Sequence, residues 1–113
     1  MRNDSPLGKI VTISVDRPLG CVHPKHPNLV YPINYGYVPN IIAADGEEQD
    51  AYIIGVNEPI ESFTGEVVAV IHRMNDVEEK WVVAPIGALF TEQEILELTK
   101  FQEQYFNIRI ISK

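Results

Sequence analysis

An acidic turn near the middle of the chain carries the residue types that bind divalent metal ions. Asp45, Glu47 and Asp50 bring three carboxylates together in sequence, and Gly46 allows the backbone to turn sharply after Asp45. Magnesium prefers oxygen ligands in near-octahedral geometry, which a few converging carboxylates can supply together with water. The spacing therefore indicates a divalent-metal site. Taken by itself, however, such a turn is more typical of a solvated loop between two strands.

Two flanking motifs support the interpretation of the acidic turn as a metal site. Upstream, residues 31–37 read Tyr-Pro-Ile-Asn-Tyr-Gly-Tyr, and downstream an acidic hairpin leads to Lys80 and then to Val-Val-Ala-Pro at 82–85. In this order and at this interval, the tyrosine motif and the acidic turn resemble the core of the soluble, family I inorganic pyrophosphatases. That family has Tyr-Pro-x-Asn-Tyr-Gly followed by Asp-Gly-Asp-Pro-x-Asp. The chain is identified as a shortened member.

The resemblance implies hydrolysis of pyrophosphate to two phosphates by a metal-activated water, with Mg²⁺ as cofactor and Mn²⁺ as a substitute. It assigns the metal ions to five carboxylates: Asp45, Glu47, Asp50, Asp76 and Glu78. Asp50 would also help to activate the water, while Tyr35 and Lys80 would complete the catalytic group. The candidates for substrate binding are Arg17, Lys25, Tyr31 and Tyr105. For Arg17 and Lys25, ordinary surface solvation is an equal alternative, because the family's early basic residues cannot be aligned uniquely here.

Several departures from the family pattern fall at functional positions. Glu47 replaces an aspartate, and Phe106 follows Tyr105 where the family has a lysine. The acidic hairpin is also short, which leaves Glu78 and Glu79 as alternative ligands. These differences support an alternative function: a degenerate pyrophosphatase-like protein that binds metal or phosphate with little or no catalysis.

Strands dominate the elements that must position these residues. Residues 10–16 alternate apolar and polar side chains, as a half-buried strand does, and β-branched apolar runs occupy 51–56, 66–72 and 80–84. The last two runs predict a hairpin. Short strands separated by turns favour a small curved barrel over a layered parallel sheet.

The remaining segments are more irregular. Residues 17–28 contain three prolines and predict an irregular loop, while 29–42 predict short extended pieces that bend at Pro32 and Gly36. A helix is expected to begin at Thr91, which forms a capping box with Glu94. Residues 107–113 indicate a terminal extended piece or a frayed end. The expected fold is mainly β (α+β): a small closed or partly open, OB-like barrel of the pyrophosphatase type with one C-terminal helix packed on it.

Composition limits the classes of protein and partner. The 113 residues carry a net charge of −7, which argues against binding to a nucleic-acid backbone. One cysteine excludes an intrachain disulfide, and the absence of a long apolar run excludes a membrane span. We therefore expect one domain over 1–113, a cytoplasmic location, and no nucleic-acid or membrane partner. A homo-oligomer is expected from the family resemblance alone.

Overall fold

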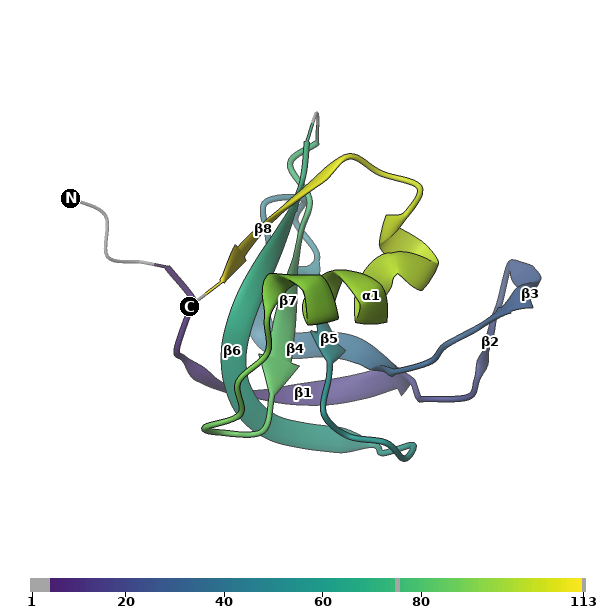
Figure 1. The fold of residues 1–113 in the computed structure, drawn as a ribbon, viewed down its shortest axis with the longest axis horizontal. Coiled ribbons are helices and arrows are strands. Elements are labelled where there is room, and N and C mark those ends of the chain that lie inside the picture. Colours follow the sequence, from purple (N-terminus) through teal and green to yellow (C-terminus); the bar gives the residue numbers. More distant parts are fainter. Residues whose placement is uncertain (1–4, 75, 113) are drawn as a thin grey trace.

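The computed structural model describes residues 5–74 and 76–112, and strands dominate it (Figure 1). In chain order the elements are β1 (Ile10–Arg17), β2 (Val22–His23), β3 (His26–Val30), β4 (Asn34–Ile42), β5 (Glu48–Ile53), β6 (Ser62–Arg73), β7 (Glu79–Ala84), α1 (Glu92–Glu103) and β8 (Ile108–Ser112). The main sheet has the order β1-β4-β5-β7-β6-β8, and β6 also pairs with β1. This extra pairing closes β1, β4, β5, β7 and β6 into a barrel. The expected fold class is therefore confirmed in its closed form.

Strand β6 closes the barrel because it is long enough to pair with three other strands. Its first part, from Ser62 to Glu66, pairs with β1, and its later part pairs with β7 on one side and β8 on the other. The register with β7 shifts between Val67 and Ala69. An extra residue of this kind bends a strand and increases its local twist. The curvature needed for closure thus lies in the middle of β6.

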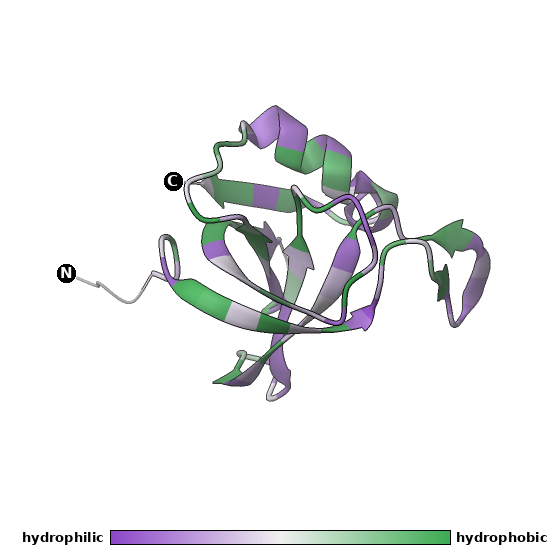
Figure 2. Ribbon diagram, turned by 90° about the horizontal axis from the view of Figure 1, so that it is seen from below, coloured by the Kyte–Doolittle hydropathy of each residue, from purple (hydrophilic) through white to green (hydrophobic). Residues whose placement is uncertain are grey.

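Both faces of the central strands are buried, which explains their continuous apolar runs. Ala51, Ile53 and Val83 belong to the cluster inside the barrel, whereas the alternate residues Tyr52 and Val82 belong to a second cluster on the outer face. Helix α1 covers this outer face and contributes Ile95 to it. In Figure 2 hydrophobic and hydrophilic residues alternate along α1, as expected for a helix with one side on the barrel.

Local capping fixes the start of α1 where the sequence predicted it. The Thr91 hydroxyl accepts a hydrogen bond from the Glu94 backbone N–H, and the Glu94 carboxylate accepts one from the Thr91 N–H. This capping box satisfies two backbone donors that the first helical turn leaves unpaired. The predicted helix start is confirmed, as is the hairpin formed by β6 and β7.

One expectation about the first half of the chain was wrong, and a second was correct only in part. The segment 17–28 is not an irregular loop, because β2 and β3 form a small two-stranded sheet that extends away from the barrel (Figure 1). Pro27 is tolerated there since an edge strand does not need every backbone N–H in a ladder. The segment 29–42 does divide at Pro32, between β3 and β4, as expected. There is no second division at Gly36, because residues 34–42 form one strand whose register with β5 is irregular after Val38.

Strand boundaries also differ from the pattern of apolar residues. Strand β5 begins at Glu48 and not at Ala51, because Glu48, Gln49 and Asp50 already pair with β4. The acidic segment is therefore partly strand. At the C-terminus, β8 confirms the expected extended piece over 108–112, while Lys113 lies outside the described residues.

The close approach of β1 and β4 leads to a stability prediction. A Cβ atom added at Gly36 would lie 2.0 Å from the Ser14 carbonyl oxygen, so Gly36→Ala should force these strands apart. We expect it to lower the free energy of unfolding by about 3 kcal/mol, as overpacking against backbone does. Urea unfolding followed by Trp81 fluorescence measures this loss.

Gly46→Ala is the matched control for Gly36→Ala. Gly46 has a φ of 87°, and apart from Gly46 and its two chain neighbours no atom of the described residues lies within 4 Å of the place that a Cβ would occupy, so its replacement strains only the backbone. We expect this strain to lower the free energy of unfolding of Gly46→Ala by about 1 kcal/mol. Equal losses for the two variants would contradict the steric explanation.

Candidate active site

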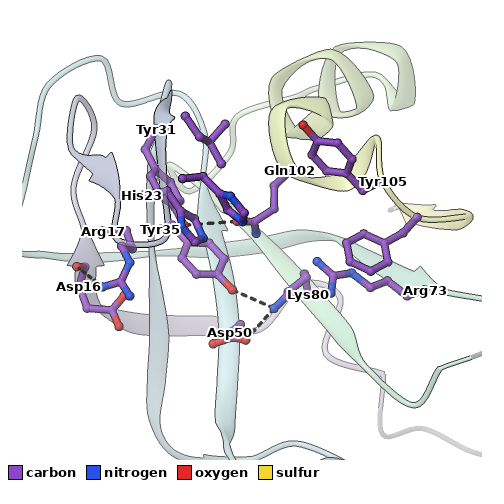
Figure 3. A pocket seen from close by; sticks show the side chains of 13 residues that line it. Asp16, Arg17, His23, Tyr31, Tyr35, Asp50, Arg73, Lys80, Gln102 and Tyr105 are labelled. Carbon is purple, nitrogen blue, oxygen red and sulfur yellow. Dashed lines mark hydrogen bonds and ion pairs between the residues drawn. The ribbon is translucent and has the colours of Figure 1, made fainter.

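A cavity of about 590 Å³ lies where the barrel strands, the β2–β3 hairpin and the end of α1 meet (Figure 3). Its charged lining residues are Asp16, Arg17, Asp50, Arg73 and Lys80, and its tyrosines are Tyr31, Tyr35 and Tyr105. In Figure 3, Asp16 and Arg17 lie on one side of the cavity and Arg73 and Tyr105 on the other, with Lys80 and Asp50 between them. Segments far apart in the sequence thus contribute to this one cavity.

The ammonium group of Lys80 is the centre of the hydrogen bonding. Its Nζ atom donates to the Tyr35 hydroxyl at 2.8 Å, to Asp50 Oδ2 at 2.7 Å and to Glu78 Oε2 at 2.8 Å. A lysine has three N–H donors, so these contacts use all of them. Burial leaves the Lys80 side chain only 5% exposed, which makes these partners necessary for its charge.

Sheet topology explains why these side chains meet. Strands β5 and β7 run parallel with Ala51 opposite Trp81, which places the preceding residues Asp50 and Lys80 side by side. On the other edge of β5, Tyr37 of β4 lies opposite Asp50, and Tyr35 lies two residues along on the same face. Residues distant in sequence are therefore adjacent across three neighbouring strands.

The environment fixes the protonation states of Lys80 and Tyr35. Burial alone would lower the pKa of Lys80, but Tyr35, Asp50 and Glu78 raise it above its ordinary value. Burial raises the pKa of Tyr35, Asp50 raises it further, and Lys80 opposes the increase only in part. At neutral pH the cavity therefore holds a lysine cation beside a neutral tyrosine hydroxyl.

A second network connects the cavity to helix α1. Arg73 donates to both carboxylate oxygens of Glu103, from Nε at 3.0 Å and from a terminal nitrogen at 2.9 Å. Glu103 also accepts the Tyr52 hydroxyl hydrogen at 2.6 Å. The other terminal nitrogen of Arg73 donates to Glu78 at 2.8 Å, and its guanidinium carbon lies 3.7 Å from the centre of the Phe106 ring. Glu78 consequently joins the Arg73 network to the Lys80 network.

The charges lining the cavity are suited to an anion. Arg17, Arg73 and Lys80 supply three cationic side chains, in a chain whose net charge is −7. Asp16 and Asp50 also line the cavity, and Glu78 and Glu103 pair with Lys80 and Arg73, so an anion binds these cations in competition with carboxylates. Arginine and lysine also donate charge-assisted hydrogen bonds to phosphate oxygens. The arrangement can therefore hold a phosphate-bearing ligand.

The predicted site residues divide into two groups by position. Those that line the cavity are Arg17, Tyr31, Tyr35, Asp50, Lys80 and Tyr105. Glu78 reaches its border through Lys80 and Arg73. The other four lie away from the cavity and are exposed: Lys25, Asp45, Glu47 and Asp76.

The predicted metal carboxylates do not converge in this conformation. Asp45 accepts the Glu47 backbone N–H and Asp76 accepts the Val77 N–H, so each caps its own turn. Asp50 and Glu78 are paired with Lys80. Among residues 5–74 and 76–112, no group of three or more His, Cys, Asp or Glu side chains could hold a metal ion. This arrangement does not fit the expected set of five ligands, and the metal assignment stays a prediction.

Residues absent from the predicted site include Asp16, Arg73, Gln102 and Glu103. A pattern in the sequence could have indicated Glu103, because Ile95, Thr99 and Glu103 follow one another at four-residue spacing and are all buried. A carboxylate that continues the buried face of a helix needs a cationic partner. Its partner, Arg73, is thirty residues away in sequence, and nothing in the local pattern connects the two.

Comparison with protein families identifies the group to which the chain belongs. Residues 8–108 match the family model described as inorganic pyrophosphatase. The chain belongs to the inorganic pyrophosphatase family. This confirms the resemblance inferred from the tyrosine motif and the acidic turn, and it makes the protein a member of an enzyme family. A search of curated proteins found no match.

Solved pyrophosphatase structures share the fold. The crystal structure of the inorganic pyrophosphatase from Ehrlichia chaffeensis aligns with a TM-score of 0.71 and 14% identity, over 99% of this chain and 91% of that one. The inorganic pyrophosphatase from Neisseria gonorrhoeae aligns with a TM-score of 0.62 and 19% identity, over 87% of this chain and 74% of that one. The inorganic pyrophosphatase from Coxiella burnetii aligns with a TM-score of 0.67 and 13% identity, over 98% of this chain and 89% of that one. At these identities the likeness establishes the barrel with its helix.

Helix α1 is too short and too polar to cross a membrane, and no other helix in the described part of the chain is long and apolar enough to do so.

Buried Tyr52 leads to a prediction for stability at alkaline pH. Burial, followed by the carboxylate of Glu103, raises the pKa of Tyr52 in the folded state above the ordinary value of 10.0. The neutral hydroxyl therefore stabilises the fold fully below pH 10, and this contribution is lost as the pH rises above it. Above pH 10, the free energy of unfolding of the wild type should fall by about 1.4 kcal/mol more per pH unit than that of Tyr52→Phe.

Urea unfolding at a series of pH values from neutral to alkaline tests this prediction. Below pH 10 the Tyr52→Phe variant is less stable than the wild type because Glu103 loses a donor, so the informative quantity is the slope of stability against pH. Parallel slopes for the two proteins would show that Tyr52 ionises as readily in the fold as in the unfolded chain.

Proposed function

We propose that this protein hydrolyses inorganic pyrophosphate to two phosphates with Mg²⁺ as cofactor. Membership of the inorganic pyrophosphatase family supports pyrophosphate hydrolysis as the reaction. The observation that carries the proposal is a cavity in which Lys80 donates hydrogen bonds to Tyr35 and Asp50. Arg17 and Arg73 line the same cavity. Pyrophosphate is a small, highly charged anion, and this cavity offers donors to its oxygens.

The proposed roles follow from the hydrogen-bonding capacity of each side chain. Lys80 uses all three donors within the protein, so a phosphate oxygen binds to it only by replacing one partner. Asp50 is the more exposed of its two carboxylate partners, at 34% against 24% for Glu78, and is the one we propose to exchange. Neutral Tyr35 donates its hydroxyl hydrogen to a phosphate oxygen.

Further donors surround this centre. Arg17 lines the cavity opposite Arg73, and the two guanidinium groups provide charge-assisted hydrogen bonds from both sides. Tyr31 lines the same cavity, but its hydroxyl already donates to Gln102 at 3.2 Å. Preorganised guanidinium donors stabilise developing negative charge at little reorganisation cost.

The metal requirement is proposed from the family, which is generally metal-dependent. When bound, a divalent ion would neutralise phosphate charge and lower the pKa of water. The exposed positions of Asp45, Glu47 and Asp76 instead favour a second candidate function: a protein that binds phosphate or metal with little turnover. The pairing of Asp50 with Lys80 supports the same alternative.

We also propose a cytoplasmic, single-domain homo-oligomer with pyrophosphate as its small-molecule substrate and no nucleic-acid or membrane partner. The acidic net charge of −7 supports the exclusion of nucleic acid. Analytical ultracentrifugation measures the oligomeric state directly.

Phosphate release from pyrophosphate tests the proposed reaction. With Mg²⁺ the wild type should release phosphate, whereas Asp50→Asn should reduce kcat by about a hundredfold or more, as loss of a catalytic base or electrostatic group does. Assays with Mg²⁺, with Mn²⁺ and with a chelator separate the metal requirement from the reaction. Glu61→Gln makes the same chemical change at an exposed position outside the cavity and should retain full activity.

Release at background level with every metal would reject hydrolysis. Calorimetry with methylenediphosphonate, a stable analogue of pyrophosphate, would then decide whether the low-turnover binding protein is correct. Full activity in Asp50→Asn would leave the reaction in place but contradict the role of that carboxylate.

A further inference from the structure

A second cavity of about 470 Å³ adjoins the proposed pyrophosphate site. It is lined by His26, Pro27, Asn28, Leu29 and Tyr105. His26, Leu29 and Tyr105 also line the first cavity, so the two spaces meet between the β2–β3 hairpin and the end of α1. A ligand held by Lys80 could therefore extend towards this second space.

The combined space is much larger than pyrophosphate requires. Cavities of about 300–1,000 Å³ typically enclose drug-sized organic ligands. The first cavity alone, at about 590 Å³, lies within that range, and the second adds a comparable volume. Pyrophosphate with its proposed Mg²⁺ would occupy the first cavity around Lys80 and Arg73, which leaves the second space for a further group.

The chemistry of the lining changes from one space to the other. The first cavity contains the cations Arg17, Arg73 and Lys80. Among the described residues, the lining of the second has no lysine, arginine or carboxylate, and is formed by two apolar side chains, two rings and the amide of Asn28. This composition suits a planar organic group with a few polar edge atoms more than a second phosphate.

Tyr105 and Leu29 provide the surfaces for such a group. Tyr105 is 73% exposed, and its ring packs on no other aromatic ring in the part of the chain that the structure describes. Leu29 is half-buried on β3. Nucleobases gain affinity by stacking on exposed aromatic side chains, largely independently of base identity.

We propose that this site binds nucleoside diphosphates, with the diphosphate at Lys80 and Arg73 and the base against Tyr105 and Leu29. The proposal rests on the proposed function, because it places the anhydride where pyrophosphate is proposed to bind. It adds a ligand class: esters of pyrophosphate that carry a heteroaromatic base. Asn28 also lines the second cavity, where its amide can meet a polar edge of the base.

Calorimetry with three stable ligands tests the contribution of the base. The ligands are methylenediphosphonate, its monomethyl ester and α,β-methylene-ADP, measured with and without Mg²⁺. The ester and the nucleotide share the same diphosphate and differ in the nucleoside. The nucleotide should bind the wild type about tenfold more tightly than the methyl ester, consistent with one base-stacking contact.

Leu29→Ala and Val30→Ala form a matched pair of variants. The two residues are neighbours on β3, but Leu29 lines both cavities, whereas the exposed Val30 lines neither. Leu29→Ala should weaken the nucleotide about fivefold and leave the methyl ester within about twofold, because partial burial of one apolar side chain is lost. Val30→Ala should change neither affinity.

The outcomes distinguish the nucleotide site from the proposed pyrophosphatase function on which it rests. Binding of methylenediphosphonate together with equal affinities for the ester and the nucleotide would overturn the nucleotide site alone. Failure of all three ligands to bind would overturn both proposals. Equal weakening of all three by Leu29→Ala would also overturn the nucleotide site, since it would mark a general structural effect.

Discussion

The buried ammonium of Lys80 is the interaction on which the site depends. A lysine charge removed from water destabilises a fold unless its donors are paired, and here each donor has a partner: Tyr35, Asp50 and Glu78. These partners come from β4, β5 and the loop before β7. The lysine can be buried only if the barrel brings these three segments to the same point.

Barrel closure and helix docking are therefore linked to the chemistry of the cavity. Glu78 bonds both Lys80 and Arg73, and Arg73 is held by Glu103 of α1, which also accepts the Tyr52 hydroxyl hydrogen. One continuous set of hydrogen bonds thus runs from the buried helix face to the cavity. A buried pair of this kind is weak evidence for net stability, but loss of one partner leaves an uncompensated charge. The network consequently fixes where the helix ends relative to the barrel strands.

Local patterns predicted the elements well where the physics is local. The apolar runs of β6 and β7 and the capping box of Thr91 depend on neighbours within a few residues, and the structure confirms them. The start of β5 was missed because Glu48, Gln49 and Asp50 pair through their backbones, which side-chain polarity does not reveal. The β2–β3 hairpin was missed because Pro24 and Pro27 interrupt its sequence, although an edge pair tolerates them.

The site was predictable only in part, since spacing in sequence is a poor guide to proximity on a barrel. Asp45, Glu47 and Asp50 form one group in the sequence, but only Asp50 lines the cavity. Its carboxylate meets Lys80 across a parallel strand pair whose register no local motif encodes. The family resemblance selected Tyr35 and Lys80, and both line the cavity, because it carries information about the whole fold.

Several of the acidic residues in this chain pair with the cations at the cavity. The carboxylates of Asp50, Glu78 and Glu103 do not simply oppose an anionic ligand, since each binds a cation that faces the cavity or supports it. Without them, Arg73 and Lys80 would be buried charges without partners and would turn towards solvent. Cationic donors can thus be held at one point of a chain whose net charge is −7. The cavity can offer these donors to an anion because nearby carboxylates hold its cations in place.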